Sequence, residues 1–82
     1  MKMISAYVLG KVEPNQEKKV VSGLKSIKGI KKAEITFGQY DFVAEVEAKD
    51  EIELKSILVD KVRLVSGIAA TMTLIANNGR SA

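Results

Sequence analysis

The hydrophobic period of the sequence switches back and forth along the chain, and this switching constrains the fold more than any other feature. Residue types alternate, as in a β-strand, in four segments: residues 3–12, 30–37, 40–47 and 68–76. The stretches after the first and the third segment instead place apolar residues three to four positions apart, as in an amphipathic helix. The sequence therefore predicts the order strand, helix, strand, strand, helix, strand.

Capping and turn residues mark the ends of both predicted helices. Pro14 is tolerated in a first helical turn, and Gly29 is a candidate left-handed residue that stops the same helix. Asp50 and Glu53 form a capping-box pattern, and Gly67 follows the second helical stretch. We therefore expect the first helix to open at Pro14 and the second to begin after Asp50.

A short break at Gly38 and Gln39 separates the second and third predicted strands, which is typical of a β-hairpin. The six elements form two βαβ halves, and right-handed crossovers fold such halves into a ferredoxin-like plait. We expect an α+β fold of βαββαβ order, with a four-stranded antiparallel sheet and both helices on one face. The 82 residues allow one domain, which we place at residues 1–76, with a polar C-terminal tail at residues 77–82.

The helix-free face of this sheet is predicted to be too apolar to remain in water. Phe37 and Phe42 are expected to face the helices. Alternation places six residues on the open face: Tyr7, Leu9, Val43, Thr71, Thr73 and Ile75. Covering this face with a second copy would contribute several kcal/mol, at roughly 25 cal/mol per Å² of apolar area. We therefore predict a dimer with four of these residues at its interface: Tyr7, Leu9, Val43 and Ile75.

The composition removes most catalytic and metal-binding chemistry, because the chain has no cysteine and no histidine. Disulfides, thiol nucleophiles and thiolate metal sites need cysteine, and histidine is the usual acid–base group and metal ligand near neutral pH. We expect no enzyme, cofactor or metal. No stretch approaches the roughly 18 apolar residues that span a bilayer, and no signal-peptide pattern is present. We therefore expect a cytoplasmic protein without a membrane partner.

The net charge of +3 is unevenly distributed. Residues 11–34 carry seven lysines and three glutamates, for a charge of +4, whereas residues 41–55 carry two lysines and six acids, for −4. A basic protein can bind nucleic acid through such lysines. Adjacent basic and acidic regions suit complementary protein surfaces at least as well, so we expect no direct nucleic-acid partner.

Four short motifs follow one another along the chain. They are Ala6-Tyr7-Val8-Leu9 leading into Lys11-Val12-Glu13-Pro14, then Ile27-Lys28-Gly29-Ile30, then Gly38-Gln39-Tyr40-Asp41-Phe42, and finally Gly67-Ile68 leading into Thr71-Met72-Thr73-Leu74-Ile75. Together they span residues 5–76. With these motifs in this order, the chain resembles the ligand-binding RAM domain of the Lrp/AsnC family of feast/famine transcriptional regulators.

The resemblance implies a stand-alone binding and oligomerisation module. Regulators of this family usually carry a helix-turn-helix domain before the RAM domain, whereas only a few residues precede the motifs here. The resemblance further implies that the effector is an amino acid or a related small metabolite. Two sheets face each other in a dimeric α/β barrel, dimers join into a ring, and the effector lies between dimers near the hairpin loop. The same sheet would also allow assembly with relatives that keep the helix-turn-helix domain.

A free amino acid needs a fixed carboxylate for its ammonium, unpaired backbone N–H groups for its carboxylate, and hydroxyl groups that orient it. The candidate ligand residues are Gly38, Gln39, Tyr40, Asp41, Thr71 and Thr73. In this interpretation Asp41 takes the ammonium and the loop backbone cradles the carboxylate, while the two threonines of the last strand supply hydroxyls.

Each candidate also has a purely structural interpretation. Gly38 allows a positive φ in the turn, Asp41 can bond the turn backbone, and Tyr40 can be an interface aromatic. Thr71 and Thr73 are good strand residues in their own right. Two other function classes remain open on the same fold: a small dimeric α/β-barrel enzyme, and a nucleic-acid binder that uses the face of the sheet.

Overall fold

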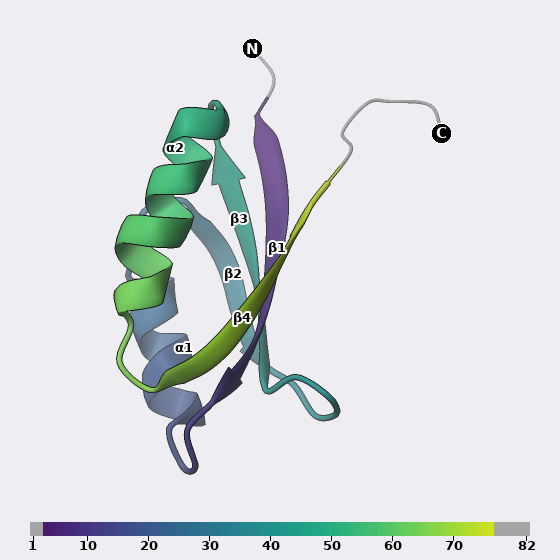
Figure 1. Cartoon of the computed structure of the whole chain (residues 1–82), viewed down its shortest axis with the longest axis vertical. Helices are drawn as coiled ribbons and strands as arrows, with labels where there is room; N and C mark the ends of the chain where they lie inside the picture. Colours follow the sequence, from purple (N-terminus) through teal and green to yellow (C-terminus); the bar gives the residue numbers. More distant parts are fainter. Residues whose placement is uncertain (1–2, 77–82) are drawn as a thin grey trace.

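The computed structural model describes residues 3–76 and contains one four-stranded antiparallel sheet. The strands are β1 (Ile4–Val12), β2 (Ile30–Ile35), β3 (Phe42–Ala48) and β4 (Ile68–Ile75), in the order β2-β3-β1-β4. Both helical segments lie on the same face of the sheet (Figure 1). This arrangement confirms the ferredoxin-like βαββαβ fold.

The helical segments differ from the expectation at their boundaries. Helix α1 (Glu17–Lys25) begins after a turn that contains Pro14, so its predicted start at Pro14 is three residues too early. Helix α2 (Glu51–Ser56) begins at the predicted N-cap Asp50, whose side chain accepts a hydrogen bond from the N–H of Glu53 at 2.8 Å. No helix within residues 3–76 is long and apolar enough to cross a membrane.

Helix α2 continues without a break through two irregular turns. A π-helical turn, η1 (Ile57–Lys61), follows it directly, and a 3₁₀ turn, η2 (Val62–Leu64), leads toward β4. At the end of η1 the N–H of Val62 bonds the carbonyl of Ile57, five residues earlier. A π-helical turn holds one residue more than an α-helical turn, and such turns occur frequently at functional sites.

The core lies between the sheet and the two helices. Its largest fully buried side chains are Val8, Val20, Leu24, Phe42, Val46 and Val62, and no polar side chain is buried in the described part of the chain. Phe42 packs directly over β1, because a Cβ on Gly10 would lie 2.3 Å from Cε2 of the Phe42 ring. Glycine at this position therefore makes room for the largest core side chain.

A β-bulge reverses the faces of β4, and it corrects the predicted open face. Ile68 pairs with Val12 and packs against the core, as alternation predicts, but the next pair joins Ala70 to Lys11 and leaves Ala69 as an extra residue. Paired residues of neighbouring strands point to the same face of the sheet. One extra residue therefore exchanges the faces of all the β4 residues that follow it.

The placement of Thr71, Thr73 and Ile75 on the open face is therefore wrong. These residues pair with Gly10, Val8 and Ala6, on the helix side of the sheet, whereas Met72 and Leu74 pair with Leu9 and Tyr7 on the open face. Tyr7, Leu9 and Val43 do lie on the open face, as predicted.

Phe37 is the second correction, because it is not packed beneath the helices as part of a strand. Strand β2 ends at Ile35, two residues earlier than expected, so Phe37 lies in the hairpin loop and its side chain is fully exposed. Phe42, by contrast, is fully buried as predicted.

The beginning of β1 and the end of β4 lie side by side. Ala6 pairs with Ile75, and the N–H of Ala76 donates to the carbonyl of Ser5 at 2.8 Å. The hairpin loop between β2 and β3 lies at the opposite end of the sheet (Figure 1). The predicted tail at residues 77–82 lies outside the described residues.

Candidate functional site

The loop between β2 and β3 is closed by bonds from one residue. Thr36 donates its N–H to the carbonyl of Asp41 at 2.9 Å and its hydroxyl to the carbonyl of Tyr40 at 2.8 Å. Gly38, at the tip, has a φ of +127°, with open space where a Cβ would lie. The glycine is thus required for its backbone conformation and leaves the loop surface accessible.

Asp41 ties this loop to β1. Its N–H donates to the carbonyl of Gly10 at 2.7 Å, and its Oδ2 accepts from the N–H of Val12 at 2.9 Å, next to the bulge. Within residues 3–76 no hydrogen bond or ion pair engages its Oδ1. One carboxylate oxygen therefore fixes the backbone, and the other keeps its capacity to accept from a ligand.

Asp41 and Gly38 line a hollow of about 540 Å³ between the hairpin loop and the start of α1. We call it the hairpin hollow; its lining residues are Asn15, Glu17, Lys18, Ile35, Thr36, Phe37, Gly38 and Asp41. It combines one ammonium group, two carboxylates and two large apolar side chains. These are the groups that a zwitterion with a carbon side chain requires.

The structure brings together only part of the predicted ligand set. Gly38 and Asp41 line the hairpin hollow, whereas Gln39 and Tyr40 do not. The Tyr40 hydroxyl instead donates to the sulfur of Met72 at 3.5 Å, which links the loop to β4. Thr71 and Thr73 lie on β4, opposite Gly10 and Val8, and neither lines the hollow.

The residues that α1 and its preceding turn contribute were not predicted as ligands. Asn15 adopts a positive φ of 67° in that turn, and Glu17 and Lys18 follow at the start of α1. In the sequence, Lys18 belongs to a group of lysines typical of a solvated helix surface. The sequence feature that could have indicated these residues is the turn at Pro14, which directs the first helical residues toward the hairpin end of the sheet.

The open face of the sheet forms a second surface beside the loop. Its apolar residues are Tyr7, Leu9, Val43, Met72 and Leu74, of which Tyr7, Met72 and Leu74 are 40%, 47% and 52% exposed. An ion pair of 3.5 Å between Lys32 and Glu34 flanks them on β2. An apolar stripe with a charged margin is typical of a protein interface.

Sequence comparison finds relatives of two kinds. A transcriptional regulator of the HTH type from Pyrococcus furiosus is 27% identical over 75 residues, which cover 88% of this chain and 50% of the regulator. A homocitrate synthase from Sulfurisphaera tokodaii is 37% identical over 71 residues, which cover 85% of this chain and 15% of the synthase. The chain thus spans about half the length of the curated regulators that it matches, and a smaller share of the synthase.

Two solved structures share the fold over nearly the whole chain. The protein TTHA0845 from Thermus thermophilus has a TM-score of 0.86 at 25% identity, over 96% of this chain and 99% of that one. The transcriptional regulator NMB0573 from Neisseria meningitidis, in complex with L-Met, has a TM-score of 0.81 at 7% identity, over 96% of this chain and 53% of that one. The second likeness is one of fold alone.

A family model also matches most of the chain. The model of the Lrp/AsnC ligand binding domain matches residues 5–78. That range includes β1 from its second residue, the other three strands, both helical segments and the hairpin hollow. The chain therefore belongs to the family of Lrp/AsnC ligand binding domains.

Proposed function

We propose that this domain is a non-catalytic sensor that binds a free amino acid in the hairpin hollow. The observation that carries this proposal is the presence of opposite charges in a single hollow next to apolar side chains. The match to the ligand binding domain and the L-Met complex of the Neisseria regulator support an amino acid as the class of ligand.

Each part of the amino acid has a partner in the hollow. The ammonium group of the ligand binds Oδ1 of Asp41, because Oδ2 already accepts from the N–H of Val12. Glu17 adds a second negative charge to the lining of the hollow. The carboxylate binds the ammonium of Lys18 and the N–H of Gly38, which forms no hydrogen bond within the described residues. The side chain of the ligand rests on Ile35 and Phe37.

Assembly completes the site in this proposal. Phe37 is fully exposed in one chain, and a neighbouring dimer that packs against the hairpin loop would cover both Phe37 and the ligand. The open faces of two copies form the dimer, and dimers join into a ring. Gln39, Tyr40, Thr71 and Thr73 remain candidate ligand residues only for an effector that is shared with a neighbouring chain.

Thermal unfolding with each of the twenty amino acids, followed by calorimetric titration of those that raise the midpoint, tests the ligand. Lys18→Gln removes the charge that faces the ligand carboxylate, and binding should weaken about tenfold. Lys25→Gln is the matched control, because Lys25 is exposed on the same helix but does not line the hollow. Equal affinity of the two variants, or no binding of any amino acid, would contradict the proposal.

Light scattering on two neighbouring β4 variants tests the dimer. Leu74→Glu places a charge on the open face and should dissociate the dimer at micromolar concentration. Ile75→Glu is the control, since Ile75 is 63% exposed but belongs to the opposite face. The open-face interface is excluded if the wild-type chain is monomeric, or if both variants behave alike.

The synthase match favours a second candidate: regulation of a biosynthetic enzyme. A region of domain size inside that enzyme is 37% identical to this chain, more than the 27% found for the regulator of Pyrococcus furiosus. Native mass spectrometry of the protein from its own cells separates the candidates. A complex with a helix-turn-helix relative supports control of transcription, whereas a complex with a biosynthetic enzyme supports control of catalysis.

A further inference from the structure

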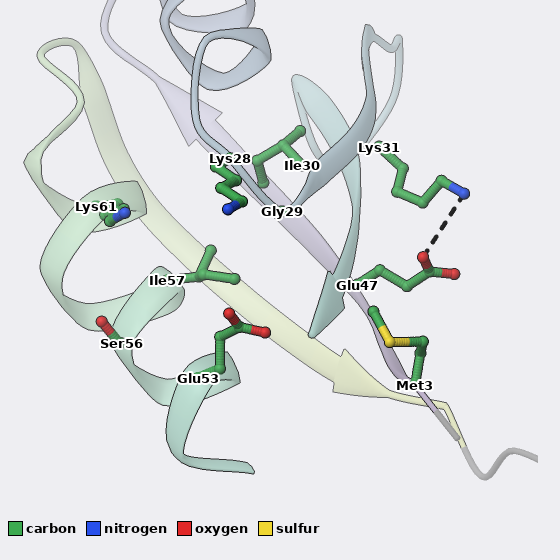
Figure 2. A pocket seen from close by; sticks show the side chains of 10 residues that line it. All are labelled: Met3, Lys28, Gly29, Ile30, Lys31, Glu47, Glu53, Ser56, Ile57 and Lys61. Atoms are coloured by element: carbon green, nitrogen blue, oxygen red, sulfur yellow. Dashed lines mark ion pairs between the residues drawn. The ribbon is translucent and has the colours of Figure 1, made fainter. Parts of the chain in front are cut away.

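A second hollow of about 570 Å³ lies at the other end of the sheet from the hairpin (Figure 2). We call it the lysine hollow. Its walls come from the turn before β2, the first residues of β2, the end of β3, and the segment formed by α2 and η1. Three of its lining residues are lysines: Lys28, Lys31 and Lys61. Its volume lies in the range of small-molecule sites, which runs from about 300 to 1,000 Å³.

Close packing fixes the two main walls relative to each other. Gly29 has a φ of +103°, and a Cβ there would lie 2.5 Å from Cδ1 of Ile57. The N–H of Glu47 donates to the carbonyl of Gly29 at 2.8 Å, which attaches the same turn to β3. The turn, the strand and the helical segment therefore hold the hollow open as one unit, before any ligand arrives.

The acidic residues of the lysine hollow are already engaged, whereas two of its lysines are not. Glu47 pairs with Lys31 at 3.6 Å, and Oε1 of Glu53 accepts from the N–H of Lys49 at 2.7 Å at the start of α2. The ammonium groups of Lys28 and Lys61 form no ion pair or hydrogen bond within residues 3–76. Glu53 keeps its negative charge, so three lysines and two glutamates give the lining of the lysine hollow a net charge of +1.

Lys61, the last residue of the π-helical turn η1, lies on the wall of the hollow. Residues four positions apart lie on one face of a helix, so Lys61 follows Glu53 and Ile57 along the same side of the helical segment. Glu53, Ser56, Ile57 and Lys61 accordingly line the same hollow. Figure 2 shows Lys28 extending from the turn before β2 toward Ile57 on the helical wall of the hollow.

We propose that the lysine hollow binds a small organic dianion of the dicarboxylate class. Lys28 and Lys61 each bind one carboxylate, and the carbon chain between the carboxylates rests on Ile57. Two lysines on separate elements favour a ligand with two separated negative charges over a ligand with one. The apolar side chain of Ile57 favours a ligand with a carbon skeleton over an inorganic ion. This site shares no residue with the hairpin hollow, so it is independent of the amino-acid site.

Saturation-transfer NMR of succinate, observed on the ligand at constant ionic strength, tests this proposal on the full chain. Succinate should bind saturably and acetate about tenfold more weakly, because acetate engages one lysine instead of two. Lys28→Gln and Lys61→Gln should each weaken succinate binding about tenfold, and Lys61→Arg should retain most of it. Both lysines lie on the surface, so the fold is not at risk.

Two controls locate the site. Lys55→Gln removes an exposed charge from α2 outside the lysine hollow, and Lys18→Gln removes the cation of the hairpin hollow; neither should change succinate binding. Equal losses in Lys55→Gln and Lys61→Gln, or a signal that never saturates, would overturn the proposal. Displacement of succinate by inorganic phosphate at lower concentration than succinate itself would overturn the assignment to dicarboxylates.

Discussion

Strands β3 and β4 both alternate in sequence, but they differ completely in burial. In β3 the alternate residues Phe42, Ala44, Val46 and Ala48 are at most 1% exposed, whereas every residue of β4 from Ala69 onward is exposed. β3 lies between β2 and β1 and contacts both helices, while β4 pairs with β1 alone. The pattern of a strand thus specifies its conformation, and its neighbours decide whether it is covered.

The two strands accordingly serve different purposes. β3 supplies the core that makes the single chain stable, and in our proposal β4 supplies surface for a second copy. Substitutions on the two strands should therefore separate stability from association. The four predictions that follow concern the stability that β3 and its neighbours supply, beginning with the largest expected effect.

Removing the largest core side chain of β3 should cost the most. Phe42→Ala leaves a cavity between Gly10 and the helices, and we expect it to lower the free energy of unfolding by about 3–5 kcal/mol. Ile75→Ala, on the uncovered helix side of β4, should cost less than about 1 kcal/mol. Urea unfolding of both variants at the same protein concentration measures the difference. Similar losses of unfolding free energy in the two variants would mean that β4 is buried to the same degree as β3.

Adding one methyl group to β1 should disturb both neighbours at once. In Gly10→Ala the new Cβ would meet the Phe42 ring on β3 at 2.3 Å and the carbonyl oxygen of Ala70 on β4 at 2.9 Å. The ring cannot shift without loosening the core, so we expect a loss of about 1–3 kcal/mol. Combining Gly10→Ala with Phe42→Leu should recover part of that loss in urea unfolding. A neutral Gly10→Ala would show that the ring has room to move.

The carboxylate that joins the hairpin loop to the bulge should contribute less. Asp41→Ala leaves the N–H of Val12 without its acceptor, and we expect a loss of about 1–2 kcal/mol because the bond is only partly buried. Asp41→Asn keeps an oxygen in place and should restore most of this stability, while it still removes the charge proposed to bind an ammonium group. Unfolding and amino-acid titration of both variants separate the structural role from the binding role.

The smallest effect concerns the helix that covers β3. Asp50→Ala removes the side-chain cap on the N–H of Glu53 at the start of α2, with an expected loss of about 1 kcal/mol. Asp50→Asn should retain nearly all of the stability, because asparagine caps as well as aspartate. Thermal unfolding followed by circular dichroism measures both variants, and an Asp50→Ala variant as stable as the wild type would show that packing alone holds α2.

The order of elements could be predicted from the sequence because each strand and helix has its own period. The faces of β1 and β3 were also predicted correctly, since one side of each strand is clearly more apolar. In β4 the apolar Met72 and Leu74 alternate with Thr71 and Thr73, a pattern that predicts the apolar pair on the helix side. The extra residue Ala69 exchanges the two faces, and no turn residue or glycine announces that bulge.

The candidate site was predictable only in its loop. Gly38 and Asp41 were identified because a glycine and an acid stand in a hairpin turn, and both line the hairpin hollow. Lys18 was missed because its position depends on where α1 begins, and the sequence placed that start at Pro14 instead of Glu17. A site that forms between two distant segments depends on such boundaries, and these are the least certain part of any pattern.

The neighbouring ends of β1 and β4 bear on how the domain can be joined to other proteins. Ser5 and Ala76 are one hydrogen bond apart, at the end of the sheet away from the hairpin. Domains whose ends lie close together tolerate insertion into the surface loops of a host chain. Grafting this domain into such a loop would need only a narrow gap in the host, and it would leave the hairpin hollow facing outward for its ligand.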